Sequence, residues 1–339
     1  GCRIQLTLHA AHRIDSYGSD GSTIRGVVIN QFDGAGVRLE SLNNTVQQNF
    51  IGTDVTGLLD LGNASHGVLV TASSSGNLIG GTTLAGANTI AFNSGDGIAV
   101  LHTSDANRIR INSIHSNDGI GIDLGDDGVT VNANNDPWQN MPTLSSAVYD
   151  GANLTIQGSV STTPFSTITF DLYASPVADP TGYGEAATYV GTATTSANII
   201  GNASFNKTFS VASLPAGSVI SATDTGASGY TSEFSQTFAV KFHPVLDLDA
   251  DDSSGASGKD FTNAWAETGG PIAIADVDAT LVDDDSANLT SLTVNVTNLQ
   301  DGANEVLAAD TTGTSIIASG GPGGTLTLTG VDSVANYQQ

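Results

Sequence analysis

The amino-acid sequence predicts an all-β fold: a short stack of parallel coils, then one β-sandwich domain and a partial second β-sandwich. Three observations lead to this prediction. The 339 residues include 40 glycines and are rich in serine, threonine and asparagine, which favour turns and strands over helices. Short apolar phrases recur in the first third of the chain, as in repeat architectures. Longer stretches of alternating apolar and polar residues follow, as in strands with one buried face.

The charge of the chain limits its partners and suggests a cofactor. Nine Lys and Arg residues stand against 34 Asp and Glu residues, which gives a formal net charge of −25. A chain without a basic stripe does not neutralise phosphates, so nucleic acid is excluded as a partner. No apolar run is long enough to span a bilayer, so membrane insertion is not expected either. Hard cations suit clustered carboxylates, which makes Ca²⁺ the expected cofactor.

Residues 1–21 form an atypical leader in this interpretation. They begin without a methionine and match none of the patterns that follow, so the chain is interpreted as a fragment or a processed piece. Cys2 is the only cysteine, which excludes an intrachain disulfide and a cysteine-based zinc site.

Residues 22–140 are expected to form the coils, because two short phrases interleave there. A glycine followed by alternating apolar residues recurs at intervals of 31, 30 and 24 residues, at Gly36, Gly67, Gly97 and Gly121. An Asn-x-Ile or Asn-x-Val phrase recurs at Asn44, Asn77, Asn88, Asn107 and Asn112. Such short strands, with polar corners and no helices between them, are expected to stack about 4.8 Å apart. The asparagines fit corners with left-handed geometry, from which their amides bond to the next coil.

These phrases carry a resemblance to a known family. The relevant stretches are Ile51-Gly52-Thr53-Asp54, Asn77-Leu78-Ile79-Gly80 and Gly121-Ile122-Asp123-Leu124. On them, residues 22–132 resemble the right-handed parallel β-helix repeats of large bacterial secreted and surface proteins. The resemblance implies the fold shared with pectate lyases and a secreted or cell-surface location, but it implies no activity.

Residues 141–242 are predicted to form an Ig-like β-sandwich. A polar, proline-containing break at residues 134–142 marks the boundary. Four segments after it alternate with period two, at residues 154–160, 167–173, 203–209 and 234–240. Each is expected to be an antiparallel strand with one face turned inward.

Residues 243–339 change composition again, to acidic loops. This portion resembles the cadherin-like repeats of bacterial surface proteins and ends inside what looks like an unfinished unit. Asp247, Asp249 and Asp251 have the first spacings of an EF-hand loop, but Asp252 stands where that loop needs glycine, and Gly258 where it needs glutamate. The EF-hand is therefore rejected. A loop-type calcium site is expected instead, from Asp247, Asp249, Asp251, Glu267, Asp276, Asp278 and Asp284. The alternative is a set of solvated acidic loops without a ligand.

Catalytic candidates lie in the coils. Asp96 and Asp118 precede glycines of consecutive repeats, 22 residues apart, and would stack if one coil spans that interval. Paired carboxylates hold a cation or act in glycoside hydrolysis, but Asp-Gly is also an ordinary turn.

A second group has the composition of a polygalacturonase-type site. Asp126 and Asp127 are the acids, with Arg108, Arg110 and His115 nearby. The basic residues precede the acids instead of following them, and no Gly-His-Gly occurs, which argues against that site.

Other candidates are weaker. Trp138 is a candidate for stacking on a sugar ring, although an isolated aromatic residue is more often packing. The six histidines are scattered through the sequence, and no zinc site is assigned to them.

The leading functional expectation is a structural or adhesive module of a large secreted or cell-surface protein. Calcium would stabilise it, and a face of the coils would bind a polysaccharide or a cell-surface protein. The alternative is a polysaccharide-active hydrolase or lyase with an acidic site on the coils. A spacer without any ligand is the third hypothesis.

Overall fold

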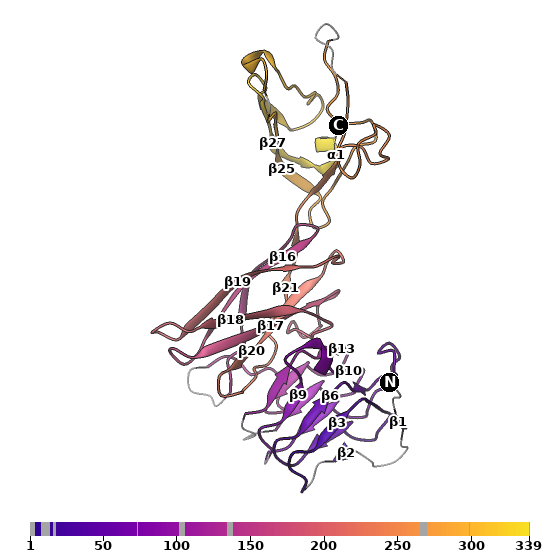
Figure 1. The fold of residues 1–339 in the computed structure, drawn as a ribbon, viewed down its shortest axis with the longest axis vertical. Helices are drawn as coiled ribbons and strands as arrows, with labels where there is room; N and C mark the ends of the chain where they lie inside the picture. Colours follow the sequence, from indigo (N-terminus) through magenta and orange to yellow (C-terminus); the bar gives the residue numbers. More distant parts are fainter. Residues whose placement is uncertain are drawn as a thin grey trace. The chain divides into compact units, whose positions relative to one another are not determined.

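The computed structural model describes residues 4–7, 14–15, 18–72, 74–101, 106–133, 138–264, 270–297 and 299–338, and it is nearly all β (Figure 1). Contacts between residues divide the chain into two compact units, Gly1–Val240 and Lys241–Gln339. Each unit is described by itself.

Parallel sheets make up the first part of unit 1. The first sheet contains β1 (Ile4–Thr7), β4 (Val27–Asn30), β7 (Phe50–Ile51), β10 (Thr89–Ala91) and β13 (Ser113–His115). The second contains β2 (Ile14–Asp15), β5 (Val37–Leu39), β8 (Val68–Val70), β11 (Ile98–Val100) and β14 (Ile122–Leu124). The third contains β3 (Thr23–Arg25), β6 (Thr45–Gln47), β9 (Leu78–Gly80) and β12 (Arg108–Arg110).

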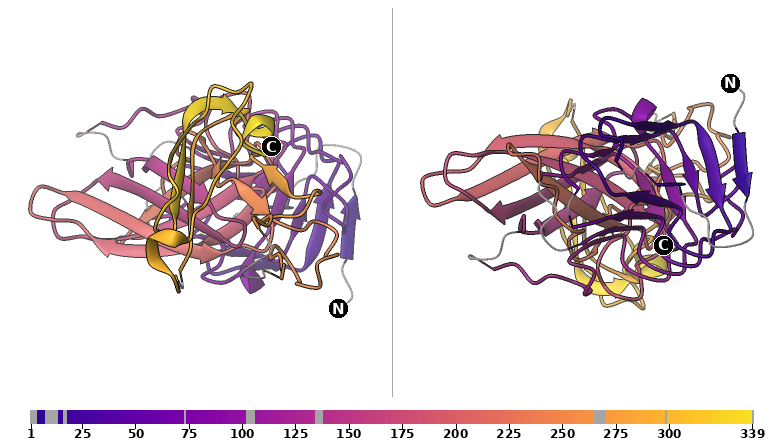
Figure 2. Two further views of the ribbon diagram at one scale, coloured as in Figure 1. Left: turned by 90° about the horizontal axis from the view of Figure 1, so that it is seen from above. Right: turned by 90° about the horizontal axis from the view of Figure 1, so that it is seen from below.

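The chain visits the third, first and second sheets in turn, and neighbouring strands within each of these sheets run parallel. We call the four successive circuits from β3 to β14 coils 1 to 4, and together the coil stack (Figure 2). This arrangement is compatible with a parallel β-helix, and it confirms the predicted all-β fold with stacked parallel strands. Segments set apart as a leader also take part, since β1 pairs with β4 and β2 with β5.

Branched apolar residues fill the inside of the coil stack in register. In the first sheet one column runs through Ile29, Ile51, Ile90 and Ile114, all buried. In the second sheet Val37, Val68, Ile98 and Ile122 form another. Each strand contributes alternate residues inward, which is why such short apolar phrases are enough to build a core.

Asparagine ladders join the coils at three corners. In each ladder the side-chain amide of one asparagine donates to the amide oxygen of the next, at 2.8–3.0 Å. The ladders are Asn44–Asn77–Asn107, Asn49–Asn88–Asn112 and Asn63–Asn93–Asn117. The prediction that the asparagine amides bond to the next coil is confirmed.

The predicted left-handed geometry belongs to a different residue. It falls on the residue before the ladder asparagine at Asn43, Gln48, Phe92, Ala106, Ile111 and Ser116. The backbone turns there, and the following asparagine then points its amide along the stack.

The recurring glycines lie where the coils approach most closely. A Cβ on Gly67 would lie 2.4 Å from Ile90 Cγ2 and 2.7 Å from the Gly97 carbonyl oxygen. Gly97 meets Ile114 and Gly121 in the same way. The glycine phrase therefore reflects packing between coils.

Coil 2 is longer than its neighbours. Six residues connect the first sheet to the second in coils 1, 3 and 4, at residues 31–36, 92–97 and 116–121, whereas sixteen do so in coil 2, at residues 52–67. The connection after β9 contains a single 3₁₀ turn, η1 (Leu84–Gly86).

Antiparallel strands make up the rest of unit 1. β16 (Asn153–Ser161) pairs with β15 (Thr143–Tyr149) and β19 (Asn202–Ser210). β17 (Thr167–Ser175) pairs with β18 (Thr188–Ser196) and β20 (Val219–Gly226), and β20 pairs with β21 (Phe238–Ala239). Three of the four predicted strands lie within β16, β17 and β19. The fourth prediction, at residues 234–240, is right only for the two residues of β21.

The antiparallel part closes the end of the coil stack. Tyr173, Ala186 and Phe234 belong to the same buried cluster as the apolar columns of the coils. Phe234 lies against Gly121, where the next isoleucine of the column would stand. Ala186 exchanges two backbone hydrogen bonds with Ile114 of β13, at 2.6 and 2.8 Å. The last coil thus has partners for its backbone and its apolar side chains.

Unit 2 has a small core of its own. It begins at β22 (Lys241–Phe242), and β23 (Val245–Asp247) pairs antiparallel with β24 (Thr280–Val282). β27 (Thr325–Ser333) pairs with β25 (Asn288–Asn295) and β26 (Ile317–Gly320), and the turn η2 (Gly302–Asn304) and helix α1 (Val334–Gln338) complete the unit. The core consists of Leu281, Ile316, Leu326, Leu328 and Tyr337.

Within the described residues of both units, no helix has the length and apolar character needed to cross a membrane.

Candidate functional sites

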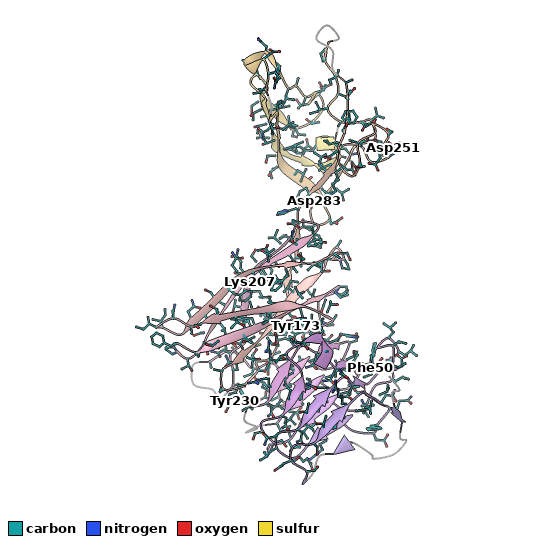
Figure 3. The ribbon with its side chains drawn as sticks, in the orientation of Figure 1. Phe50, Tyr173, Lys207, Tyr230, Asp251 and Asp283 are labelled. Carbon is teal, nitrogen blue, oxygen red and sulfur yellow. The ribbon has the colours of Figure 1, made fainter. Side chains whose placement is uncertain are left out.

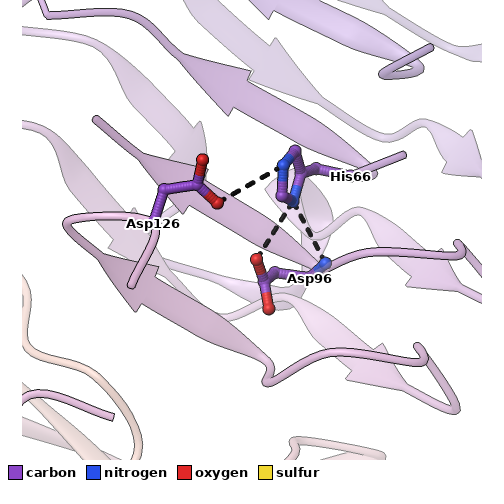
Figure 4. A group of neighbouring side chains, drawn as sticks. All are labelled: His66, Asp96 and Asp126. Carbon is purple, nitrogen blue, oxygen red and sulfur yellow. Dashed lines mark hydrogen bonds and ion pairs between the residues drawn. The ribbon is translucent and has the colours of Figure 1, made fainter. Parts of the chain in front are cut away.

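The first candidate site lies on the second parallel sheet, where His66, Asp96 and Asp126 meet (Figure 4). His66 and Asp96 stand two residues before β8 and β11, and they occupy equivalent positions because Val68 pairs with Ile98. Asp126 arrives differently, from a turn after β14. Asp126 has a φ of 57°, and the backbone N–H groups of Asp127 and Gly128 donate to the Asp123 carboxylate at 3.2 and 2.8 Å.

The imidazole of His66 lies between two carboxylates. Its Nδ1 is 3.0 Å from Asp96 Oδ2 and 3.1 Å from the Asp96 backbone nitrogen, and its Nε2 is 3.5 Å from Asp126 Oδ1. The other oxygen of Asp96 accepts a hydrogen bond from the Ile120 backbone N–H at 2.8 Å. One ligand atom from each of the three residues lies within 4.8 Å of the others.

The electrostatics of this site are dominated by carboxylates. The hydrogen bond that the protonated imidazole donates to the Asp96 carboxylate raises the pKa of His66, against the opposing effect of burial. Asp123, which is only 3% exposed, lies beneath the turn. Burial raises the pKa of Asp123, and the charges of Asp96 and Asp126 raise it further. The sequence predicted Asp96 and Asp126 as acids but missed His66, although His66-Gly67 and Asp96-Gly97 occupy matching places in two repeats.

The predicted stack of Asp96 on Asp118 does not form. Ile98 pairs with Ile122, so this coil spans 24 residues, and Asp96 stands beside Ile120. Asp118 instead follows the third asparagine ladder, and its backbone N–H donates to the Asn93 carbonyl at 2.9 Å.

The predicted polygalacturonase-type group is divided among three sheets. Arg108 and Arg110 belong to β12 in the third sheet, His115 to β13 in the first, and Asp126 and Asp127 follow β14 in the second. Arg110 has a structural partner, since Nε and Nη2 each donate to Asp171 at 2.7 Å. This pair raises the pKa of Arg110 and joins coil 4 to β17.

His115 and Asp118 do share a cleft, together with Glu185 and Asp179 from the loop after β17. The cleft has a volume of about 620 Å³. Both oxygens of Glu185 accept backbone N–H groups, from Ser116 at 2.7 Å and from Asn117 at 3.2 Å. Burial raises the pKa of Glu185 and lowers that of His115. The sequence patterns did not indicate Glu185 as a site residue, because its hydrogen-bond partners lie 68 and 69 residues away in the chain.

A second cluster lies in unit 2, where Asp249, Asp276 and Asp278 each place one carboxylate oxygen within 4.8 Å of the others. Asp249 is fully buried and accepts backbone N–H groups from Ser253 and Ser254 at 3.0 and 2.9 Å. Asp251, labelled in Figure 3, donates its backbone N–H to Asp278 Oδ2 at 2.9 Å. Among the described residues, the buried Oδ1 of Asp278 has no hydrogen-bond partner.

Mutual repulsion affects this second cluster. Hydrogen bonds from Ser254 lower the pKa of Asp249. Loss of hydration raises the pKa of Asp278, and the charges of Asp251 and Asp276 raise it further. Asp249 comes from one segment of unit 2, and Asp276 and Asp278 come from another, more than 20 residues later. The fold therefore holds these carboxylates together although they repel one another.

The remaining predicted residues have other surroundings. Asp247 accepts the Asp249 backbone N–H at 3.2 Å and so lies beside the unit 2 cluster. Asp284 is exposed in the turn after β24, and Glu267 lies outside the described residues. Trp138 packs, partly buried, against the core of the coil stack.

Comparison with known proteins gives no further guide. No protein-family model matches the sequence, and no curated protein matches it. The geometry of the two clusters and of the cleft is therefore the basis for a functional proposal.

Proposed function

We propose that this chain is a structural or adhesive module of a large secreted or cell-surface bacterial protein, stabilised by Ca²⁺. In this proposal residues 22–140 are a right-handed parallel β-helix, residues 141–242 an Ig-like β-sandwich and residues 243–339 a partial cadherin-like β-sandwich. The proposal rests on the convergence of Asp249, Asp276 and Asp278, and on the buried Oδ1 of Asp278, which has no hydrogen-bond partner among the residues that the structure describes.

The donor set of the unit 2 cluster fits calcium. Ca²⁺ takes six to eight oxygen ligands, and Asp carboxylates and backbone carbonyls are its usual protein donors. Asp247 and Asp251 stand beside the three clustered residues and would supply further oxygens. When bound, the ion supplies positive charge that offsets the repulsion among the carboxylates.

The coil stack would present the binding face. The outward residues of the third sheet are mostly polar, with Thr45 and Gln47 in register with Thr23 and Arg25. Such a regular face suits a polysaccharide chain or an extended surface of another protein. With nine Lys and Arg residues against 34 Asp and Glu residues, the rest of the surface is not expected to attract an anionic partner.

The calcium proposal predicts a thermal shift in the full chain. After treatment with a chelator, adding Ca²⁺ at about 100 times its Kd should stabilise unit 2 by about 2.7 kcal/mol, which is several degrees in melting temperature. The shift should disappear in Asp276→Asn combined with Asp278→Asn, because both remove ligand charge. The control Asp284→Asn, an exposed acid of the same unit, should keep it. An equal shift in both variants would contradict this site.

The cleft supports a second candidate function, a polysaccharide-active enzyme. His115, Asp118 and Glu185 line it together, and burial raises the pKa of Glu185 toward that of a general acid. The test is release of reducing ends and unsaturated uronates from a panel of plant and algal polysaccharides, with Ca²⁺ or with EDTA. Product that vanishes in Asp118→Asn or Glu185→Gln, but persists in Asp284→Asn, would replace the module proposal by an enzyme.

A further inference from the structure

We propose that His66 and Asp126, with Asp96 behind the imidazole, form a binding site for a borderline divalent cation of the Zn²⁺ class. This site lies on the coil stack, in unit 1. It is separate from the calcium site of unit 2 and does not depend on the proposed function.

The donors distinguish this site from the unit 2 cluster. His66 offers a nitrogen, whereas Asp249, Asp276 and Asp278 offer only oxygens. Imidazole nitrogen combined with carboxylate oxygen is typical of zinc and related transition metals, and purely oxygen donor sets are typical of calcium and magnesium.

The separation of the donors fits a bound metal. His66 Nε2 and Asp126 Oδ1 are 3.5 Å apart, which is too long for a good hydrogen bond. Zinc bonds of about 2.0–2.1 Å to nitrogen and oxygen, set at tetrahedral angles, place two ligand atoms about 3.3–3.4 Å apart. A small relaxation of the exposed Asp126 side chain is enough to reach this spacing.

Asp96 holds the imidazole in the required orientation. Its Oδ2 lies 3.0 Å from Nδ1, its backbone nitrogen lies 3.1 Å from the same Nδ1, and its Oδ1 accepts the Ile120 N–H (Figure 4). Metal binding at Nε2 requires the tautomer in which Nδ1 carries the proton and donates it to Oδ2, in place of accepting the Asp96 N–H. A carboxylate that engages one ring nitrogen leaves the other free for a metal and increases the basicity of the ring, a common arrangement around zinc. Asp96 is a positioning residue in this proposal.

The local charge favours a cation. Asp96, Asp123 and Asp126 surround one imidazole, and Asp123 is almost completely buried. Arg38 lies on the same face of this sheet, in register with Leu69, and its guanidinium forms an ion pair with Glu40. A divalent ion at His66 would reduce the repulsion among the three carboxylates.

The bound ion would join three levels of the coil stack. His66 belongs to the corner before β8 in coil 2, Asp96 to the corner before β11 in coil 3, and Asp126 to the turn after coil 4. Zn²⁺ should therefore raise the melting temperature of unit 1 in addition to binding.

The test is a titration of the full chain with Zn²⁺ by calorimetry and with Co²⁺ by visible absorption. A four-coordinate site with a nitrogen ligand gives intense Co²⁺ bands, whereas an oxygen-only, six-coordinate site gives weak ones. We expect intense bands in the parent protein and their loss in His66→Ala and in Asp126→Asn. Asp96→Asn should retain the bands with about 10- to 100-fold weaker affinity, as for other residues that orient a metal ligand.

His115→Ala is the matched control, because it removes another histidine of the coil stack that lies in a different sheet. This variant should bind Co²⁺ as the parent does. Intense bands that survive in His66→Ala, or a parent protein without them, would overturn the proposal. Without metal, His66→Ala should keep the circular-dichroism spectrum and the melting temperature of the parent protein, which shows that unit 1 is folded. The calcium shift of unit 2 should persist in this variant, which keeps the two sites distinguishable.

Discussion

At the scale of single residues, Glu233 connects the antiparallel part of unit 1 to the end of the coil stack. Its two carboxylate oxygens accept the backbone N–H groups of Leu124 and Thr130, each at 2.9 Å. Burial raises the pKa of Glu233 to about 7, and burial does the same for Asp224. A carboxylate in this position titrates near neutral pH.

These raised pKa values predict that the protein loses stability as pH rises. The ordinary pKa of a glutamate such as Glu233 is 4.5, so the native state binds more protons than the unfolded state between about pH 4.5 and 7. The free energy of unfolding therefore falls through this window, by about 3 kcal/mol at most for a shift of this size. Asp224 contributes in the same direction. In Glu233→Gln the free energy of unfolding should fall less steeply with pH, because one of the titrating carboxyl groups is gone. Urea unfolding from about pH 5 to 8 measures this slope.

Asp284→Asn is the control for this pH prediction, because it removes an exposed acid. Its slope should match that of the parent protein. A slope in Glu233→Gln as steep as in the parent would show that Glu233 does not titrate in this window.

At the scale of elements, the glycine phrase predicts a packing requirement between coils. Gly67→Ala would place a methyl group 2.4 Å from Ile90 Cγ2 and 2.7 Å from a backbone oxygen. Because neither neighbour has room to move in a filled core, we expect a loss of about 1–3 kcal/mol in the free energy of unfolding. Chemical denaturation measures it.

Gly34→Ala is the matched control, since a Cβ there meets nothing within 4 Å. It should leave the stability of the protein almost unchanged. Equal losses in the two variants would mean that backbone freedom, and not contact between coils, explains the repeated glycine.

The sequence predicted the elements of the coil stack better than its corners. Glycine and asparagine phrases that begin a strand repeat visibly, and five ladder asparagines were found that way. Four were missed. Asn49 fits the Asn-x-Ile phrase but was overlooked, whereas Asn63, Asn93 and Asn117 each precede a loop and not an apolar strand. Asp126 reaches His66 through a turn of left-handed geometry that no periodic pattern indicates.

The acids that close the stack carry no sequence signal at all. Glu185 and Glu233 meet coil 4 from segments 68 to 109 residues away, and their positions depend on how the antiparallel strands pack. In unit 2 the composition pointed to seven acids, and three of them, Asp249, Asp276 and Asp278, converge from two Asp-rich loops. It did not separate them from Asp284, which is exposed in a different turn.

At the scale of the whole of unit 1, the antiparallel part substitutes for the next coil. Glu185 takes the place of the next ladder asparagine, and its Oε1 accepts the backbone N–H of Asn117. Thr231 and Tyr173 accept the backbone N–H groups of Ile109 and Ile111 through their hydroxyls, at 3.0 and 3.1 Å. An open edge of parallel strands invites pairing with other chains, so this closure covers the edge that coil 4 would otherwise expose.

The ion pair between Arg110 and Asp171 tests that closure. Asp171 is fully buried, so Arg110→Ala leaves an uncompensated charge and should cost about 3–5 kcal/mol. Arg110→Met combined with Asp171→Leu removes both charges and should recover most of the loss, as replaced buried pairs often do. Thermal unfolding of the full chain measures both. A double variant as unstable as the single one would show that the pair itself is required.

The long connection of coil 2 has a consequence for how such a chain diversifies. Residues 53–62 leave the coil stack after Gly52 and return at Asn63, and the Leu61 N–H donates to the Gly52 carbonyl, so the excursion closes on itself. The asparagine ladder and the glycine column continue past it without a break. We therefore expect this corner to accept grafted sequence without a change of register, and a peptide displayed between Asp54 and Asp60, with Leu61 retained, should inherit the rigidity of the scaffold beneath it.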